Sequence, residues 1–166
     1  RPADPRVVRR PRDVGALTDR LAAGLTRLGV GRGVKVGLCL PNAPYSVVFY
    51  FAVLKAGGTV VNYNPLYTPR ECLAQIRDSE TTIMVVPDIE RVYGPVAAVA
   101  DEAGLRHLVV CPFADVLPVG RGVLYRLFKR TERARIPADA RHVSVSTLLS
   151  GRSVPRDRHA PRPDDV

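Results

Sequence analysis

Apolar residues recur at helical spacing near the start of the chain. Four leucines follow one another at intervals of three or four residues, at Leu17, Leu21, Leu25 and Leu28. This spacing places them on one face of a helix, and the glycine that follows at position 29 is typical of a helix end. The pattern therefore predicts an amphipathic helix that starts at Asp13 and stops before Gly29.

Farther along, short apolar runs alternate with longer stretches that have helical character. Short runs rich in β-branched residues predict buried strands, and the longer stretches predict helices. The expected strands are 34–40, 59–62, 83–86 and 107–110. The expected helices between them are 45–56, 69–79 and 92–103. The first of these helices is apolar on nearly all sides, which predicts deep burial.

This βαβαβαβ order with short connections defines the fold class as α/β. Strands joined through helices pair in parallel with right-handed crossovers. We therefore expect a parallel sheet with helices on both faces. Residues 143–149 predict one more short element beyond this sheet.

The clearest local signal lies where the second strand passes into the next helix. Thr68 occupies the N-cap position, Pro69 the first helical position, and Glu71 stands three residues after the cap. These residues form a capping box with proline at its favoured place. Such a cap contributes about 1 kcal/mol to the stability of a helix. The helix is therefore expected to begin at Pro69.

Composition adds a question about partners. The 166 residues are 46% hydrophobic and 25% charged, as in a globular chain with room for one domain, but the net charge is +9. Such a charge favours nucleic acid or an anionic membrane. The basic residues, however, are nearly all arginines, and they concentrate near the two ends of the chain, before Val34 and after Arg121. A biased composition explains them equally well, and we do not expect nucleic acid as a partner.

The three cysteines are Cys39, Cys72 and Cys111, each in or beside an apolar segment. No pair has the close spacing of a metal site, and their number is odd. Small buried thiols are therefore favoured over a metal site or a disulfide. Free thiols agree with a reducing cytoplasm.

Three features that resemble binding sites have simpler interpretations. The glycine cluster at 29–33 follows a helix and leads into a strand, whereas a phosphate loop follows a strand and opens a helix. It is predicted to be a turn. Asn42 follows a strand end, where α/β folds bind ligands, yet fixing the turn or capping the next helix is favoured. His107 lacks metal-ligand spacing with His142 or His159, which favours a structural or solvent role.

Three motifs together resemble the early N-terminal region of acyl-CoA synthetases. They are Leu40-Pro41-Asn42, Leu54-Lys55-Ala56-Gly57-Gly58, and Asn62-Tyr63-Asn64-Pro65-Leu66-Tyr67-Thr68-Pro69-Arg70-Glu71. The nearest resemblance is to bacterial long-chain fatty-acid–CoA ligases of the adenylate-forming, AMP-binding superfamily. It implies a full-length enzyme that activates a fatty acid with ATP and Mg²⁺ and passes the acyl group to CoA. Val34 stands where the family commonly has an acidic residue.

The catalytic motifs that this family requires do not occur in the sequence. The family holds the triphosphate with a Ser/Thr/Gly-rich loop containing a lysine, and this chain has no such loop. We therefore expect no catalytic, cofactor-binding or metal-binding residue here, and no cofactor bound by this fragment. Structural duties are expected for the matched residues Pro41, Asn42, Lys55, Gly57, Asn62, Pro65 and Tyr67. For Tyr67, packing in its loop is favoured over bordering the acyl site.

The resemblance also predicts how the chain is divided. Residues 1–12 are expected to be a disordered or torn N-terminal end, and 13–150 a partial AMP-binding N-terminal domain. Residues 151–166 are expected to be a linker leading toward the missing phosphate loop. The chain begins at Arg1 rather than Met, and 163–166 resembles the sequence just before that loop. We therefore expect an incomplete first part of the adenylate-forming N-terminal domain.

A basic segment at 121–142 is the least determined part of the sequence. Residues 122–130 predict a short basic amphipathic helix, either a surface helix, which is favoured, or a membrane-surface contact. The resemblance places a variable insertion here. It also implies a cytoplasmic enzyme with peripheral contact to the inner face of the membrane, because its fatty-acid substrate partitions into lipid. Acyl-chain length and oligomeric state are left open.

Three hypotheses follow for the chain as a whole. The first is a fragment of an ATP-dependent fatty acid–CoA ligase, inactive alone, with an exposed sheet edge and a bare core face. The second is a stand-alone basic α/β binding module for nucleic acid or anionic membrane, whose affinity would depend steeply on salt. The third is a truncated relative that acts as a non-catalytic interaction protein.

Overall fold

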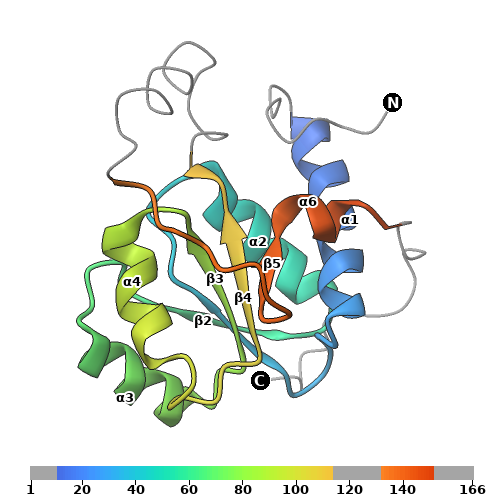
Figure 1. Ribbon diagram of the computed structural model, residues 1–166. Helices are drawn as coiled ribbons and strands as arrows, with labels where there is room; N and C mark the ends of the chain where they lie inside the picture. Colours follow the sequence, from blue (N-terminus) through green and yellow to red (C-terminus); the bar gives the residue numbers. More distant parts are fainter. Residues whose placement is uncertain (1–10, 114–131, 152–166) are drawn as a thin grey trace.

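The computed structural model describes residues 11–113 and 132–151 (Figure 1). Its described part contains a five-stranded sheet in the order β2-β1-β3-β4-β5, with every neighbouring pair parallel. The strands are β1 (Lys35–Leu38), β2 (Thr59–Asn62), β3 (Ile83–Pro87), β4 (His107–Cys111) and β5 (His142–Ser144). The helices are α1 (Pro11–Arg27), α2 (Pro44–Lys55), α3 (Pro69–Ser79), α4 (Glu90–Val99) and α6 (Val145–Leu149).

Helices cover both faces of the sheet, which confirms the predicted class. Figure 1 shows α1, α2 and α6 on one face and α3 and α4 on the other. Side chains alternate along β3: Ile83 and Val85 enter the cluster under α1 and α2, whereas Met84 and Val86 enter the cluster under α3 and α4. Each face therefore has its own apolar core.

Several boundaries differ from the sequence prediction. Helix α1 begins at Pro11, two residues before the expected start, and β1 is shorter than predicted. Helix α4 runs from Glu90 to Val99 rather than over 92–103. Its last turn is tighter than an α-helical turn, because Ala100 N–H donates to Ala97 O, three residues back, at 3.3 Å. The element predicted at 143–149 is in fact two, β5 and α6.

The prediction that α2 is deeply buried was wrong for half of its surface. Phe49 and Val53 are completely buried against the sheet and α1. On the opposite side, Val47, Tyr50 and Phe51 are exposed. The helix is apolar all round, but the described fold covers only one face of it.

Helix α6 is fastened to α1 by arginines and a close backbone approach. Arg20 Nη2 donates to Leu149 O and Arg27 Nη2 to Leu148 O, both at 2.6 Å. These donors satisfy carbonyls near the end of the short helix, which lack helical partners. A Cβ on Gly24 would lie 2.6 Å from Leu148 O, so glycine permits the contact.

Some predictions fall on residues that the structure does not describe. These are 1–10, most of the linker at 151–166, and 122–130 with its expected basic helix. Within the described ranges, no helix is long and apolar enough to cross a bilayer.

Candidate functional site

The carboxyl ends of β1, β2 and β3 form the candidate site, because parallel α/β sheets bind ligands at this edge. The strand order reverses between β1 and β3, since β2 lies on one side of β1 and β3 on the other. The loop after β2 carries the sequence motif, and its backbone is tightly organised. Asn64 Oδ1 accepts a hydrogen bond from Leu66 N–H at 3.0 Å, and Asn64 O accepts one from Tyr67 N–H at 3.1 Å. Asn64 therefore fixes the turn locally.

The capping box at the start of α3 is present as predicted. Thr68 N–H donates to Glu71 Oε2 at 2.8 Å, and Glu71 N–H donates to Thr68 Oγ1 at 3.4 Å. The Thr68 hydroxyl also donates to Glu71 Oε2 at 2.7 Å. These bonds favour the ionised carboxylate and lower the pKa of Glu71.

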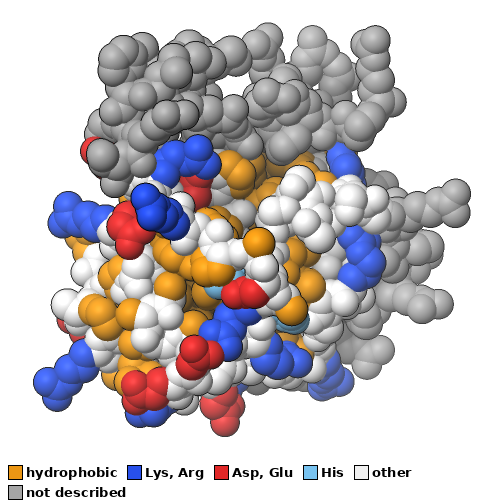
Figure 2. All heavy atoms as spheres, in the orientation of Figure 1, with side chains coloured by type: hydrophobic (Ala, Val, Ile, Leu, Met, Phe, Trp, Pro, Cys, Tyr) orange, Lys and Arg blue, Asp and Glu red, His pale blue; other side chains and the backbone are white. Residues whose placement is uncertain are grey.

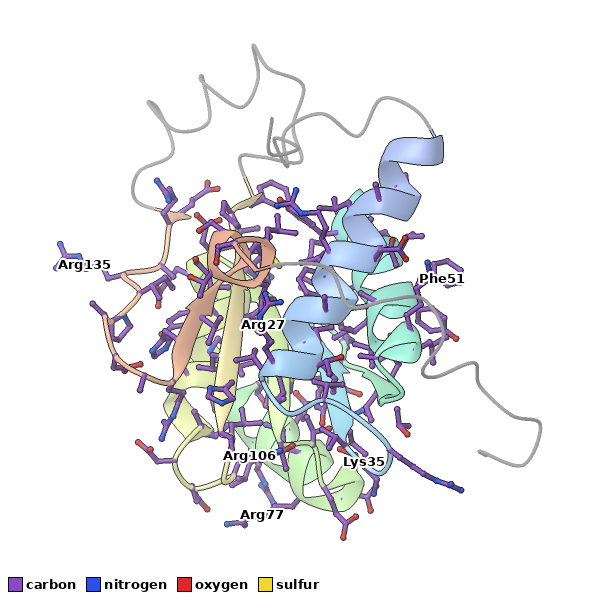
Figure 3. The ribbon with its side chains drawn as sticks, turned by 90° about the vertical axis from the view of Figure 1, so that its right-hand side faces the viewer. Arg27, Lys35, Phe51, Arg77, Arg106 and Arg135 are labelled. Carbon is purple, nitrogen blue, oxygen red and sulfur yellow. The ribbon has the colours of Figure 1, made fainter. Side chains whose placement is uncertain are left out.

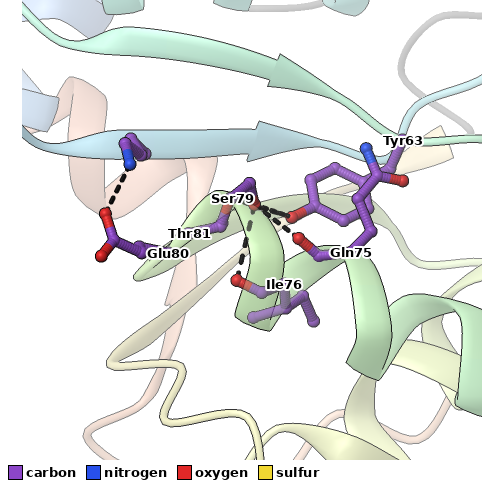
Figure 4. A network of polar contacts seen from close by, with 7 residues as sticks. Tyr63, Gln75, Ile76, Ser79, Glu80 and Thr81 are labelled. Carbon is purple, nitrogen blue, oxygen red and sulfur yellow. Dashed lines mark hydrogen bonds and ion pairs between the residues drawn. The ribbon is translucent and has the colours of Figure 1, made fainter.

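Tyr63 connects this loop to the far end of α3 (Figure 4). Its hydroxyl donates to Thr81 Oγ1 at 2.9 Å and lies 2.9 Å from Ser79 Oγ. Burial raises the pKa of Tyr63, and its hydrogen bonds with Ser79 and Thr81 oppose that shift. A Cβ on Gly37 would lie 2.8 Å from the Tyr63 ring, so the ring lies over β1 only because position 37 is glycine. The described contacts make Tyr63 structural.

A hollow of about 460 Å³ opens beside this loop, between α2 and the ends of β1 and β2. Its ten lining residues are all uncharged: Leu38, Leu40, Asn42, Ser46, Val47, Tyr50, Phe51, Asn62, Tyr63 and Pro65. Sequence reasoning did not find this hollow. The signal available was the uninterrupted apolar character of α2, which was interpreted as burial.

Asn42 does not cap α2, so that part of its favoured interpretation was wrong. Ala43 is the N-cap residue, with no side-chain cap, and Ser46 Oγ donates to Ala43 O at 2.6 Å. Asn42 instead lines the hollow with Asn62. Tyr67 packs against the apolar cluster under α3 and α4, in agreement with its prediction as a packed loop aromatic.

Asp88, directly after β3, is a buried carboxylate that sequence reasoning missed. One oxygen accepts from Phe113 N–H at 2.6 Å, and the other accepts from Arg133, with Nη2 at 2.9 Å. Ala134 N–H also donates to Asp88 O at 3.1 Å. Asp88 thus joins the end of β4 to residues 132–144, which we call the strap. A polar residue after a buried strand was the signal that pointed to this position.

The strap has two further polar attachments. The His142 ring lies between Asp139, 2.7 Å from Nδ1, and the Tyr93 hydroxyl, 2.8 Å from Nε2. Its hydrogen bonds lower the pKa of Asp139. Arg141 pairs with Asp101. The Tyr93 side chain is buried, so this Tyr–His–Asp chain fastens the strap and presents no nucleophile to solvent.

The described side chains offer little reactive chemistry. All three cysteines are free and buried, as predicted. Burial raises the pKa of Cys39 to about 12 and that of Cys111 well above its usual range, so both thiols stay protonated at neutral pH. The described residues contain no group of three or more His, Cys, Asp or Glu that could hold a metal ion. The glycine cluster at 29–33 leads from α1 into β1 and forms a turn, as predicted.

The fold and this edge define a doubly wound α/β domain with a parallel sheet. A family model described as "AMP-binding enzyme" matches residues 12–166. The chain is 33% identical over 125 residues to the long-chain-fatty-acid–CoA ligase of Bacillus subtilis (strain 168), a match that takes in 74% of this chain and 21% of that protein. The chain therefore belongs to the AMP-binding enzyme family.

Solved structures agree with this assignment. A long-chain-fatty-acid-CoA ligase from Archaeoglobus fulgidus superimposes with a TM-score of 0.56 at 31% identity, covering 60% of this chain and 20% of that one. A benzoate CoA ligase from Burkholderia xenovorans LB400 gives a TM-score of 0.64 at 16% identity, covering 91% and 24%. The second likeness shows the fold alone. The chain spans about a fifth of the length of the ligases it matches.

Proposed function

We propose that this chain is part of an ATP-dependent fatty acid–CoA ligase. The carboxylate of a fatty acid would attack the α-phosphorus of ATP, giving acyl-adenylate and pyrophosphate. The CoA thiol would then displace AMP and form the thioester. The observation that carries this proposal is the AMP-binding model match over residues 12–166, with the fatty-acid–CoA ligase of Bacillus subtilis among the relatives.

Within such an enzyme, these residues would serve as scaffold. The described residues contain no metal-binding cluster, and their glycine cluster lies before a strand rather than a helix, so they do not fit ATP or Mg²⁺. ATP, Mg²⁺ and CoA would be bound by sequence outside the 166 residues. We propose that the 166-residue chain alone is inactive.

The test is pyrophosphate release by the protein expressed from the complete reading frame. We expect release that requires ATP, Mg²⁺ and a long-chain fatty acid, and formation of acyl-CoA when CoA is added. Benzoate in place of the fatty acid is the control, since a benzoate ligase shares the fold. The 166-residue chain assayed in parallel should release none. Equal release with and without fatty acid would contradict the proposal.

The second candidate, a basic binding module, rests on the net charge of +9. Against it, several described cations are ion-paired, among them Lys35 with Glu80 at 2.6 Å, Lys55 with Asp19 at 2.6 Å and Arg77 with Glu102 at 2.9 Å. On the face in Figure 2, basic and acidic side chains are interleaved. A fluorescence titration with DNA and with anionic vesicles at rising salt tests the module. Binding that weakens steeply with salt, without ligase activity, would favour it over the ligase.

We also propose that the enzyme works in the cytoplasm, at the inner face of the membrane, because a long-chain fatty acid partitions into lipid. Cell fractionation tests this. We expect the protein in both the soluble and the membrane fractions, with the membrane-bound part released by high salt. Retention in the membrane after a salt wash would contradict peripheral attachment.

A further inference from the structure

The strap has little apolar support from the rest of the fold. Among its residues only Val143 is buried, while Ala134 and Ile136 are partly buried against the cluster under α3 and α4. Figure 3 shows Arg135 of the strap directed away from the fold. In β3, by contrast, all five residues are buried. Segments with few buried apolar contacts open at a lower free energy than the core does.

Ion pairs attach the strap on either side of α4. Asp88, just before this helix, pairs with Arg133, and Asp101, just after it, pairs with Arg141. The side chains of Arg133 and Arg141 are 44% and 32% exposed, and that of Asp101 is 89% exposed. Exposed ion pairs contribute little to stability, because water replaces the lost contact. The charged attachments of the strap can therefore break without unfolding the sheet.

Two backbone hydrogen bonds join the opposite ends of the strap to the rest of the fold. Near its start, Ala134 N–H donates to Asp88 O at 3.1 Å. Near its end, Leu108 N–H of β4 donates to Arg141 O at 2.9 Å. The two bonds share no residue, and both must break if the whole strap leaves. They therefore report separately on its two ends.

The chain is fastened again directly after the strap. Helix α6 buries Val145, Leu148 and Leu149. Arg27, which Figure 3 shows between α1 and α6, donates to Leu148 O at 2.6 Å. Helix α6 can therefore stay in place when the strap moves, with Ser144 at the junction between them.

We infer that the strap opens from the rest of the fold as one unit, while β1 to β4 and α6 stay folded. Strand β5, the last part of the strap, is three residues long and pairs only with β4 in the described sheet. Such a short pairing is weak by itself, so loss of the contacts at one end of the strap releases the other. Opening leaves β4 as an end strand of the described sheet, with backbone groups free to pair with another strand.

The test is hydrogen exchange of single backbone amides in the 166-residue chain, followed by NMR. The reference is Cys39 N–H, which donates to Val85 O between β1 and β3 at 2.9 Å. In the unsubstituted protein we expect equal protection factors for Ala134 and Leu108, within about threefold. Both should be at least about tenfold lower than the protection factor of Cys39.

Variants at each end of the strap test whether it opens as one unit. Asp88→Asn breaks the pair with Arg133 and should lower the protection of both reporter amides by about tenfold or more. Arg141→Gln breaks an exposed pair at the other end and should lower both by about twofold to fivefold. Arg77→Gln, which breaks another exposed pair, with Glu102, is the matched control and should change neither.

A fall in protection confined to Ala134 in Asp88→Asn, or to Leu108 in Arg141→Gln, would mean that the two ends open separately and would overturn the inference. So would reporter amides as protected as Cys39 in the unsubstituted protein, since the strap would then open only when the whole chain unfolds. That comparison needs no variant, so it decides the question even if Asp88→Asn does not fold. Ligase activity enters none of these measurements, so the inference and the proposed function fail independently.

Discussion

The two edges of the sheet differ in the kind of side chains that surround them. At the β5 edge, the strap is held by polar contacts between named partners: Asp88 with Arg133, Asp101 with Arg141, and His142 between Tyr93 and Asp139. Beside the β2 edge, apolar side chains of α2 and of the following loop are exposed; β2 and β5 are both end strands of the described sheet.

The two edges differ in how far their side chains are satisfied by contacts within the described residues. The polar residues at the β5 edge find their partners within the described residues. On the outer side of α2, Val47, Tyr50 and Phe51 are exposed, although the inner side of the same helix is buried. Within the described residues, α2 is therefore apolar on two faces and covered on one.

The largest expected effect contrasts the two faces of α2. Phe49 is completely buried, so Phe49→Ala should lower the free energy of unfolding by about 3–5 kcal/mol. Phe51, two residues away, is half exposed, and Phe51→Ala should cost less than about 1 kcal/mol. Urea denaturation followed by circular dichroism measures both in the 166-residue chain. Equal costs would mean that the outer face is already covered, and the contrast between the edges would fail.

The next effect concerns the fastening of the β5 edge. Asp88→Ala removes the acceptor for Phe113 N–H and the partner of Arg133, and should cost about 2–3 kcal/mol. The cost stays below that of breaking a fully buried ion pair, because the Arg133 side chain is 44% exposed and can be hydrated. Asp101→Ala, which breaks an exposed pair with Arg141, is the control and should cost less than about 1 kcal/mol. A neutral Asp88→Ala would show that the strap does not depend on this carboxylate.

A smaller effect is expected at the motif loop beside the β2 edge. Thr68→Ala removes the N-cap of α3 and should lower the free energy of unfolding by about 1 kcal/mol. Thr68→Ser keeps a hydroxyl at this position and should retain most of the stability. Urea denaturation midpoints for the three proteins measure the difference. Equal denaturation midpoints for the Ala and Ser variants would mean that the capping hydrogen bond does not stabilise α3.

The smallest effect is the pH dependence of the two edges. Hydrogen bonds from Thr68 lower the pKa of Glu71 below its ordinary value of 4.5, and those from His142 lower the pKa of Asp139 below 3.8. A lowered folded-state pKa stabilises the fold above the ordinary value, and this contribution is lost as pH falls through the folded value. Stability should therefore decline as pH falls below about 4.5.

Glu71→Gln and Asp139→Asn should each flatten that decline, and Asp78→Asn on α3 is the control. Thermal midpoints between pH 6 and pH 2.5 measure the slopes. A slope that neither variant changes would contradict the assigned hydrogen bonds.

Much of the fold was predictable because its signals are local. The spacing of apolar residues gave the strand–helix order, and β2 and α3 have the predicted bounds. The N-cap, proline and glutamate of α3 act within four residues of one another, so their sequence alone specifies their contacts. The end of α4 was misplaced because its last hydrogen bonds tighten gradually, which apolar spacing does not encode.

The site was less predictable because its contacts join distant positions. Asp88 meets Phe113 and Arg133, which lie 25 and 45 residues away in sequence, and no local pattern connects them. The apolar character of α2 was visible in the sequence, but which of its faces would be covered was not. The hollow likewise exists only because α2, β1 and β2 are brought together.

The sequence by itself determined the element order, the capped start of α3, the buried thiols and the likeness to acyl-CoA synthetases. These depend on the identity and spacing of neighbouring residues. Only the tertiary structure decided that polar contacts hold the strap at the β5 edge and that apolar side chains remain exposed beside β2. Burial and long-range pairing depend on how the elements pack in space, because the same apolar residue stabilises a core when covered and marks an interface when exposed.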